Sequence, residues 1–244
     1  MSRRVIHLDE THSTSSYLNE LASTQPLDEG SVVWAEFQTA GRGQRGNSWE
    51  SIAGKNLSFS ILLHPVFVEV NKSFILSQIA SLAVKSVLDN YVSGIKIKWP
   101  NDIYWHDKKI CGILVENNLT GTAITRTVIG IGINVNQEAF YSDAPNPVSL
   151  TQISGQVYDR QVVLEAVISK LLSLYYEAKV NPEAIVAEYM RSLYRGTGYY
   201  PYRDNQGDFF AKIAGIEPSG HLVLQLQNGG ERHYAFKEVR FLHI

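Results

Sequence analysis

The spacing of apolar residues predicts four helices. Between residues 72 and 91 the apolar side chains recur three or four positions apart, which is typical of an amphipathic helix of about five turns. Residues 162–178 and 182–193 also have helical patterns. A shorter helix is expected near the N-terminus, with Ser13 or Thr14 as its N-cap. These two hydroxyls could serve only as caps, or they could present a helix N-terminus to a polar ligand.

Strands are expected wherever the pattern becomes alternating or continuously apolar. Residues 95–99 alternate between apolar residues and lysine, which indicates a half-buried strand. Residues 109–116 and 127–135 are nearly all apolar, so we expect both strands in the centre of a sheet. Residues 136–160 are irregular and could form a second loop over the sheet. The expected strands are residues 4–8, 31–37, 57–63, 95–99, 103–105, 109–116 and 127–135.

The pattern changes again after Gly196. Short alternating segments are separated there by the turn sequences EPSG and NGG, which is typical of small antiparallel sheets. The sequence therefore predicts two domains, an α/β domain over residues 1–193 and a small all-β domain over residues 194–244.

One long polar segment, residues 38–54, separates two of the expected strands. Loops of this length without secondary structure of their own are usually functional. Gly41 and Gly43 allow a close approach of the backbone to a ligand, and Arg42 and Arg45 supply charges that suit a phosphate or a carboxylate. We therefore expect this loop to fold over an anionic small molecule.

Composition and charge narrow the class of protein. The 244 residues are 44% hydrophobic, which is enough for a sizeable core, and the net charge of -2 argues against a general nucleic-acid binder. The single cysteine, Cys111, excludes an intramolecular disulfide, and no apolar run reaches the length of a membrane span. A cytoplasmic location without a membrane partner is expected.

Familiar catalytic signatures do not explain the sequence. The P-loop pattern is missing, and GIGINV at 130–135 departs from the dinucleotide-binding fingerprint at its last position. The histidines show no paired spacing for a metal. Cys111 lies in an apolar strand, where a buried and inert thiol is expected rather than a nucleophile.

Four polar residues lie where strands end, and they allow two interpretations. Lys109 opens an apolar strand just after a polar turn, so its ammonium group could sit at a sheet end, near a ligand. Asn101, Asp102 and Asn134 lie at similar positions. Each could equally be an ordinary turn residue, because Asn and Asp favour turns for local reasons and Lys109 could simply be solvated. A common site with the 38–54 loop would favour the functional interpretation.

Four blocks of the sequence resemble the signature blocks of biotin protein ligases. They are GRGQRGNSW at 41–49, KWPNDIY at 98–104, KKICGILVE at 108–116 and GIGINVN at 130–136, in the family's order and spacing. The resemblance covers roughly residues 4–193. It implies an α/β (α+β) catalytic domain with a mixed sheet of the class II synthetase-like, biotin/lipoate ligase type. A small C-terminal SH3-like β-barrel is expected to follow.

The resemblance also implies a two-step reaction. Biotin would attack ATP with the help of Mg²⁺, giving biotinyl-5′-AMP and pyrophosphate. A lysine of a biotin carboxyl carrier protein would then attack the adenylate and release AMP. The implied partners are biotin, ATP and the carrier domain, and a homodimer formed by sheet pairing is possible.

The residues implied by matching motifs form two groups. Lys109 and Arg42 would be catalytic, and Asp102 is a possible ligand of Mg²⁺, although no metal site is directly assignable. The expected biotin-binding residues are Ser13, Thr14, Ser15, Gln38, Gly41, Arg42, Gly43, Gln44, Trp49, Lys109 and Gly112. The expected nucleotide-binding residues are Arg45, Asn101, Asp102 and Asn134.

The chain departs from the family pattern at two positions. Some members have a third loop arginine where this chain has Gln44, and an asparagine where it has Ser15. The missing cation should weaken retention of the adenylate. Dual-function members carry an N-terminal winged helix-turn-helix, for which the sequence has no room, so we expect no DNA partner and a monofunctional enzyme.

Two alternatives remain. A lipoate-protein ligase would share the fold and the adenylation chemistry, but it should show an RR-x-S/T-GGG block where this chain has GRGQRG. A non-catalytic biotin-binding regulator would not need Lys109 and the loop arginines, which are intact here.

Overall fold

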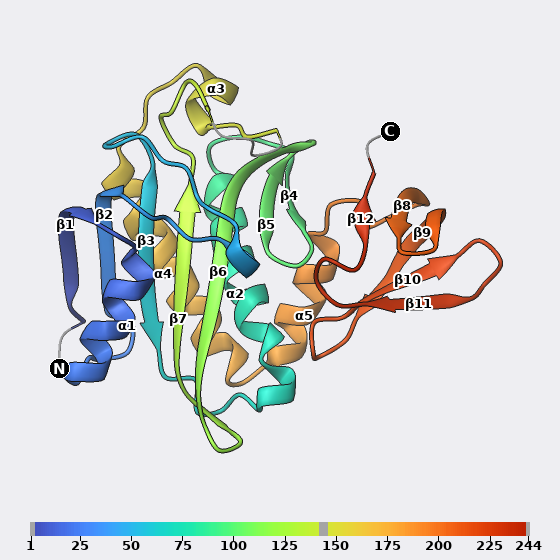
Figure 1. Cartoon of the computed structure of the whole chain (residues 1–244), viewed down its shortest axis with the longest axis horizontal. Helices are drawn as coiled ribbons and strands as arrows, with labels where there is room; N and C mark the ends of the chain where they lie inside the picture. Colours follow the sequence, from blue (N-terminus) through green and yellow to red (C-terminus); the bar gives the residue numbers. More distant parts are fainter. Residues whose placement is uncertain (1–2, 142–145, 243–244) are drawn as a thin grey trace.

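A seven-stranded mixed sheet forms the centre of the computed structural model, which describes residues 3–141 and 146–242 (Figure 1). The strands lie in the order β1-β2-β3-β7-β6-β5-β4. The pair β1–β2 is parallel, and the other neighbouring pairs in this sheet are antiparallel. The bounds are β1 (Val5–Thr11), β2 (Val32–Gln38), β3 (Leu57–Leu63), β7 (Ala123–Ile133), β6 (Lys108–Thr120), β5 (Asp102–Trp105) and β4 (Ile95–Lys98).

Helices cover both faces of this sheet, which explains the continuously apolar strands. Helix α1 (Thr14–Thr24) covers one face, and α2 (Phe74–Leu88), α4 (Arg160–Ala178) and α5 (Pro182–Arg191) cover the other (Figure 1). Neighbouring residues of β3 therefore enter different cores: Ile61 packs in the larger cluster, and Leu62 packs with Leu18 of α1 in the smaller one. The predicted central positions of β6 and β7 are confirmed.

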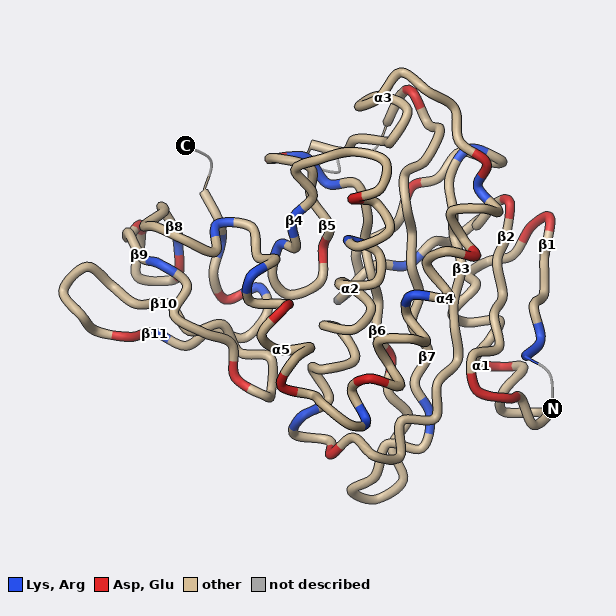
Figure 2. Tube along the Cα trace, turned by 180° about the vertical axis from the view of Figure 1, so that it is seen from behind, with Lys and Arg blue, Asp and Glu red and all other residues tan. Residues whose placement is uncertain are grey.

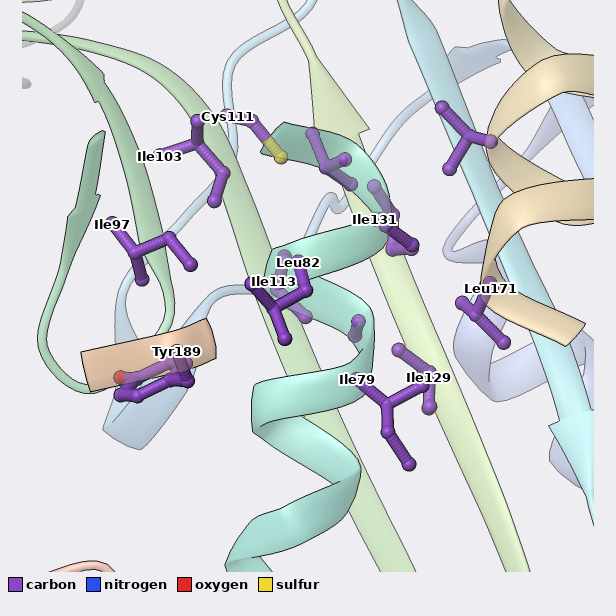
Figure 3. Close-up of a cluster of buried hydrophobic side chains, with 14 of the residues drawn as sticks. Ile79, Leu82, Ile97, Ile103, Cys111, Ile113, Ile129, Ile131, Leu171 and Tyr189 are labelled. Carbon is purple, nitrogen blue, oxygen red and sulfur yellow. The ribbon is translucent and has the colours of Figure 1, made fainter. Parts of the chain in front are cut away.

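The larger core is a layer of branched side chains between the sheet and α2. Ile79 and Leu82 of α2 face isoleucines of β6 and β7, and Tyr189 of α5 closes the edge of the cluster (Figure 3). The Tyr189 hydroxyl donates to Pro100 O at 2.5 Å, so the helix also fixes the turn between β4 and β5. This packing holds the strand ends that carry the polar residues of the site.

The C-terminal residues form a separate five-stranded antiparallel sheet, in the order β11-β10-β9-β8-β12. An all-β segment after Gly196 is therefore confirmed, although the pattern did not reveal β8. The domain boundary at residues 193 and 194 remains a prediction. Contacts with the larger sheet include the bond from Trp99 Nε1 to Gly220 O at 2.9 Å. The strands are β8 (Tyr200–Asp204), β9 (Gly207–Ile216), β10 (Leu222–Leu226), β11 (Glu231–Tyr234) and β12 (Arg240–Phe241).

The described residues form neither a long run of one charge nor a helix suited to a membrane. Basic and acidic residues are interspersed along the trace (Figure 2). Among the helices of the described residues, none combines the length and the hydrophobicity that a bilayer span requires.

Cys111 should be unreactive in the folded protein. Its thiol is fully buried in the core, and burial raises its pKa well above the usual value, so little thiolate forms at neutral pH. We expect iodoacetamide to leave the native protein unmodified at pH 7.5 and to alkylate it completely in guanidinium chloride, as measured by intact mass. Rapid alkylation of the native protein would contradict this burial.

Candidate functional site

A cavity of about 790 Å³ lies over β6 and β7, beneath the 38–54 loop. Its wall also includes the N-terminus of α1, residues of β4 and β5 beside their connecting turn, and Phe236, which lies between β11 and β12. The cavity thus brings together segments of the larger sheet and of the C-terminal region. The sequence-predicted residues that line it are Ser13, Thr14, Ser15, Gln38, Arg42, Gly43, Gln44, Trp49, Asp102, Lys109, Gly112 and Asn134.

The floor of the cavity consists largely of glycine backbone. Gly112 of β6 pairs with Gly132 of β7, and Leu114 pairs with Gly130 two residues further along, on the same face. Side chains on these glycines would fill the space above the sheet. The glycines therefore make room for a group that lies flat on the strands.

The indole of Trp49 takes part of this space. A Cβ atom on Gly132 would lie 2.3 Å from Trp49 Cε2, and one on Gly112 would lie 3.0 Å from Trp49 Cζ3. The indole Nε1 is buried without a hydrogen-bond partner. Gly112 was expected to admit the ligand itself, whereas in this structure it admits the side chain of the loop.

Hydroxyl groups form a buried polar cluster at the start of α1. Ser13 is the N-cap, with its Oγ accepting from Ser16 N at 3.5 Å. Thr14 N donates to Gln38 Oε1 at 2.8 Å, and the Thr14 hydroxyl lies 2.8 Å from Ser60 Oγ. The two interpretations of these hydroxyls are therefore compatible, because Ser13 caps the helix and both Ser13 and Thr14 line the cavity.

Two cations lie at different points along the floor, each beside a carboxylate. Lys109 Nζ is 2.8 Å from Asp102 Oδ1, and it lies 6.0 Å from the centre of the Trp49 ring. Arg42 Nη2 is 2.8 Å from Glu116 Oε2. Lys109 therefore lines the cavity and is paired with Asp102, and its part in a reaction stays a prediction. The 38–54 loop is joined to the sheet through both Trp49 and Arg42.

Lys98 is a cavity residue that the sequence pattern concealed. The alternation of residues 95–99 placed Lys98 on a solvated face, but its ammonium group donates to Tyr104 Oη at 3.1 Å and lies 5.4 Å from the centre of the Phe241 ring. Burial lowers the pKa of Lys98, and nearby Asp102 opposes that shift. The available signal was its position in the KWPNDIY block.

Two of the expected residues whose side chains the structure describes do not line the cavity. Asn101 is buried, and its Nδ2 donates to Ile113 O at 2.8 Å, which makes it a structural link between the β4–β5 turn and β6. Gly41 acts within the loop, since a Cβ atom there would lie 2.5 Å from Trp49 O. The side chain of Arg45 lies outside the described residues.

Asn134 is still compatible with both a structural role and a role in ligand binding. Its Nδ2 donates to Val148 O at 3.1 Å, which fixes the end of β7 against the following segment. Its Oδ1 is buried without a partner, although the residue lines the cavity. An unsatisfied buried acceptor at a cavity wall suits a ligand that brings a donor.

The segment after β7 forms another wall of the cavity. Residues 136–160 were expected to be irregular, and the described part contains the short helix α3 (Leu150–Ser154). Phe140 and Tyr141 line the cavity, which sequence reasoning missed. The fully buried Gln137 accepts from Ile52 N at 3.1 Å and donates to Ala139 O at 2.8 Å. Gln137 therefore joins this segment to the end of the 38–54 loop.

Within the residues that the structure describes, no group of three or more His, Cys, Asp or Glu side chains could hold a metal ion. Asp102, the residue considered for Mg²⁺, contacts Lys109 instead. Any divalent cation at this site would therefore need most of its ligands from a substrate.

Comparison with known proteins identifies the family and agrees with the fold. Residues 7–134 match the model of the "Biotin/lipoate A/B protein ligase family". The bifunctional ligase/repressor BirA of Bacillus spizizenii is 32% identical over 243 residues, covering 96% of this chain and 73% of that protein. The biotin--[acetyl-CoA-carboxylase] ligase of Mycobacterium tuberculosis is 29% identical over 225 residues, covering 89% of this chain and 81% of that protein.

Among solved structures, the biotin protein ligase from Aquifex aeolicus in complex with biotin and ATP superimposes with a TM-score of 0.81. The two chains are 26% identical, and the match covers 99% of this chain and 100% of the other. The seven-stranded mixed sheet and the C-terminal five-stranded sheet are thus both included. On the family match and these near full-length similarities, the chain belongs to the biotin/lipoate A/B protein ligase family and, within it, to the biotin protein ligases.

Proposed function

We propose that this enzyme activates biotin with ATP as biotinyl-5′-AMP and transfers the biotinyl group to a lysine of a biotin carboxyl carrier protein. The observation that carries the proposal is one cavity with a polar cluster at α1, a glycine floor and the Lys109 ammonium beside that floor. These three environments match the ureido group, the apolar ring and tail, and the carboxylate of biotin.

Biotin would lie along the glycine floor. The hydroxyls of Ser13, Thr14 and Ser15 and the amide of Gln38 would exchange hydrogen bonds with the ureido head. Trp49 would cover the tail after its indole, which lies against Gly112 and Gly132 in this structure, has moved off the floor. The carboxylate would then point towards Lys109, the cation nearest that end of the floor.

In the first step, a carboxylate oxygen of biotin attacks the α-phosphorus of ATP, and the bond to pyrophosphate breaks. Both reactants are anions, so the ammonium of Lys109 lowers the barrier by neutralising charge as they approach. In the second step, the carrier amine attacks the carbonyl carbon of the mixed anhydride, and AMP leaves. The adenylate is already activated, so positioning supplies much of the rate and no nucleophile of the enzyme is required.

The nucleotide would occupy the part of the cavity near the β4–β5 turn. Asp102, Asn134 and Lys98 line it there, and the half-buried ammonium of Lys98 suits a phosphate group. Asn101 would support this turn from behind through Ile113 rather than contact ATP. Arg45 belongs to the same proposal through its place in the loop motif.

The cavity residues could hold Mg²⁺ only together with phosphate groups of the substrate. Mg²⁺ is usually held by one or two carboxylates together with substrate phosphates, so the absence of a ligand cluster in the described residues is compatible with it. Asp102 is the carboxylate that would help to hold the ion. When bound with ATP, Mg²⁺ would supply charge neutralisation on the phosphates.

The direct test uses the purified protein with ATP, Mg²⁺ and a biotin carboxyl carrier domain. We expect biotin-dependent release of pyrophosphate and a mass increase of the carrier by one biotinyl group. A carrier whose target lysine is replaced by arginine should stay unmodified. Modification by lipoate or octanoate, with none by biotin, would show that the proposal is wrong.

Arg42→Ala should release biotinyl-5′-AMP faster. Loss of a charge-assisted hydrogen bond to an anion costs about 1.5–3 kcal/mol, which corresponds to roughly ten- to a hundredfold faster dissociation. We expect free adenylate to appear in the medium and unrelated lysines to become labelled. Arg191→Ala, which removes another exposed arginine, is the control. An unchanged dissociation rate in Arg42→Ala would remove Arg42 from this role.

A further inference from the structure

Two of the hydroxyls at the start of α1 contact a serine of β3. Ser60 is fully buried, and its Oγ lies 2.8 Å from Thr14 Oγ1 and 2.9 Å from Ser15 Oγ. Ser60 pairs with Gly130 of β7, where a Cβ atom would lie 2.4 Å from Ser15 Oγ. The glycine therefore leaves room for this cluster, in which Thr14 and Ser15 line the cavity and Ser60 is enclosed behind them.

The order of the protons in this cluster follows from the atoms that can donate. The atom 2.8 Å from Thr14 N must be an oxygen, Gln38 Oε1, because a backbone N–H can only donate, and the Thr14 hydroxyl lies 3.1 Å from the same oxygen. A hydroxyl has one proton, so Thr14 donates to Gln38 and must accept from Ser60. Ser60 has then used its own proton, and it accepts from Ser15. Only this order makes all three contacts hydrogen bonds.

This order decides which groups the site offers to a ligand. The protons of Thr14 and Ser15 point to protein oxygens, so both hydroxyls offer lone pairs to the cavity that they line. Ser13 differs, because its Oγ accepts from Ser16 N and its own proton is not used in that bond. The Nε2 group of Gln38 takes no part in the order and can donate. This end of the cavity therefore offers two acceptors and two donor groups. A cyclic urea, with two N–H groups and one carbonyl oxygen, is the complement of that set.

We propose that Ser60 is a positioning residue that sets the direction of hydrogen bonding in the site: by donating to Thr14 and accepting from Ser15, it makes both hydroxyls acceptors for the N–H groups of a cyclic urea. This inference rests on the proposed function. Without Ser60, the Ser15 hydroxyl would lose this acceptor and would be free to turn its proton towards the ligand. A donor that meets a donor leaves both unsatisfied, which is costly in a buried site.

The same order has a consequence for selectivity. Lipoate and octanoate carry no N–H group at the end that would lie here, so they would leave the buried acceptors of Thr14 and Ser15 unpaired. A site built to bond an N–H group strongly rejects an analogue that lacks it. Ser60 therefore favours biotin over other acyl substrates without contacting any of them.

Pyrophosphate exchange and titration calorimetry with biotin test this role. In Ser60→Ala we expect the KM and the Kd for biotin to rise about tenfold, as for the loss of one or two ordered hydrogen bonds. The kcat at saturating biotin and the KM for ATP should not change, because only binding of the urea is weakened. Desthiobiotin, which keeps the cyclic urea but lacks the sulfur, should lose affinity by the same factor. In a Ser15→Ala background, Ser60→Ala should cost less than in the wild type, because part of its effect acts through that hydroxyl.

Ser81→Ala is the matched control. It removes another fully buried serine hydroxyl, from α2 on the other face of the sheet, and it should bind biotin as the wild type does.

Three outcomes would overturn the inference. Unchanged KM and Kd for biotin in Ser60→Ala would show that the order of the protons has no role in binding. Equal losses of affinity for biotin and ATP, with a lowered thermal midpoint, would show a purely structural role, and full additivity with Ser15→Ala would show that Ser60 acts elsewhere. A wild type that binds biotin and exchanges pyrophosphate, with Ser60→Ala equal to it, defeats this inference alone. A wild type that does neither defeats the proposed function as well.

Discussion

Replacing Lys109 with alanine is expected to slow adenylate formation by about two to three orders of magnitude, the usual cost of removing one group that stabilises transition-state charge. The reason is electrostatic, since the ammonium lies where we place the approach of the biotin carboxylate to the α-phosphate. The fold should survive. The Lys109 side chain contacts Asp102, which is itself about one-third exposed and can be hydrated after the substitution.

The measurement is biotin-dependent exchange of pyrophosphate into ATP, with Lys108→Ala as the control. Lys108 is the neighbouring lysine, and its side chain is exposed outside the cavity. We expect Lys108→Ala to retain activity within about twofold, in line with the small effects of surface substitutions. Near-normal exchange in Lys109→Ala, with an unchanged thermal midpoint in both variants, would exclude Lys109 from the chemistry.

Gly132→Ala should nearly abolish biotin binding. Its Cβ atom would lie 2.3 Å from Trp49 Cε2 and 2.5 Å from Trp49 Nε1, so the indole would have to leave the floor. The loop would lose its apolar contact with the sheet, and the methyl group would occupy space that we assign to the ligand. We expect the dissociation constant for biotin to rise at least about a hundredfold, or roughly 2.7 kcal/mol.

Titration calorimetry with biotin tests this expectation, and Gly215→Ala provides the matched control. A Cβ atom on Gly215 meets nothing within 4 Å, so that variant should bind biotin normally. Thermal unfolding should be compared as well, because a midpoint lowered equally in the presence and absence of biotin would indicate a folding defect. Normal biotin affinity in Gly132→Ala would show that the indole position is irrelevant to binding.

The elements that could be predicted from the sequence are those in which buried apolar residues recur at the spacing of a helix or a strand. The helix expected at 72–91 corresponds to α2, because one broad face of it packs on the sheet. The second half of β7 is buried on both faces, and the middle of β6 has one buried face and one half-buried face beneath the 38–54 loop, so both sequences are nearly all apolar there. Strand β8 was missed because its residues, YPYRD, alternate only weakly and include Pro201.

The motifs predicted correctly that most of the site residues lie close together, but not what each side chain contacts. Most of the expected residues do line one cavity, but the role of Asn101 depends on a contact with Ile113 that sequence spacing does not reveal. Lys98 was missed for a different reason. Alternation shows on which face of the strand a side chain lies, but it does not show that C-terminal residues cover that face. Phe236 and Phe241 come from more than 130 residues further along the chain.

The hydrogen bonds of Gln137 couple the conformations of two walls of the cavity. The same buried amide contacts the end of the 38–54 loop, on one wall, through Ile52, and its own segment, on the other wall, through Ala139. Neither wall can change its conformation near this point without disturbing the hydrogen bonds of the other. A ligand that orders one wall therefore favours order in the other, and the entropic cost of enclosing it is shared between them rather than incurred twice.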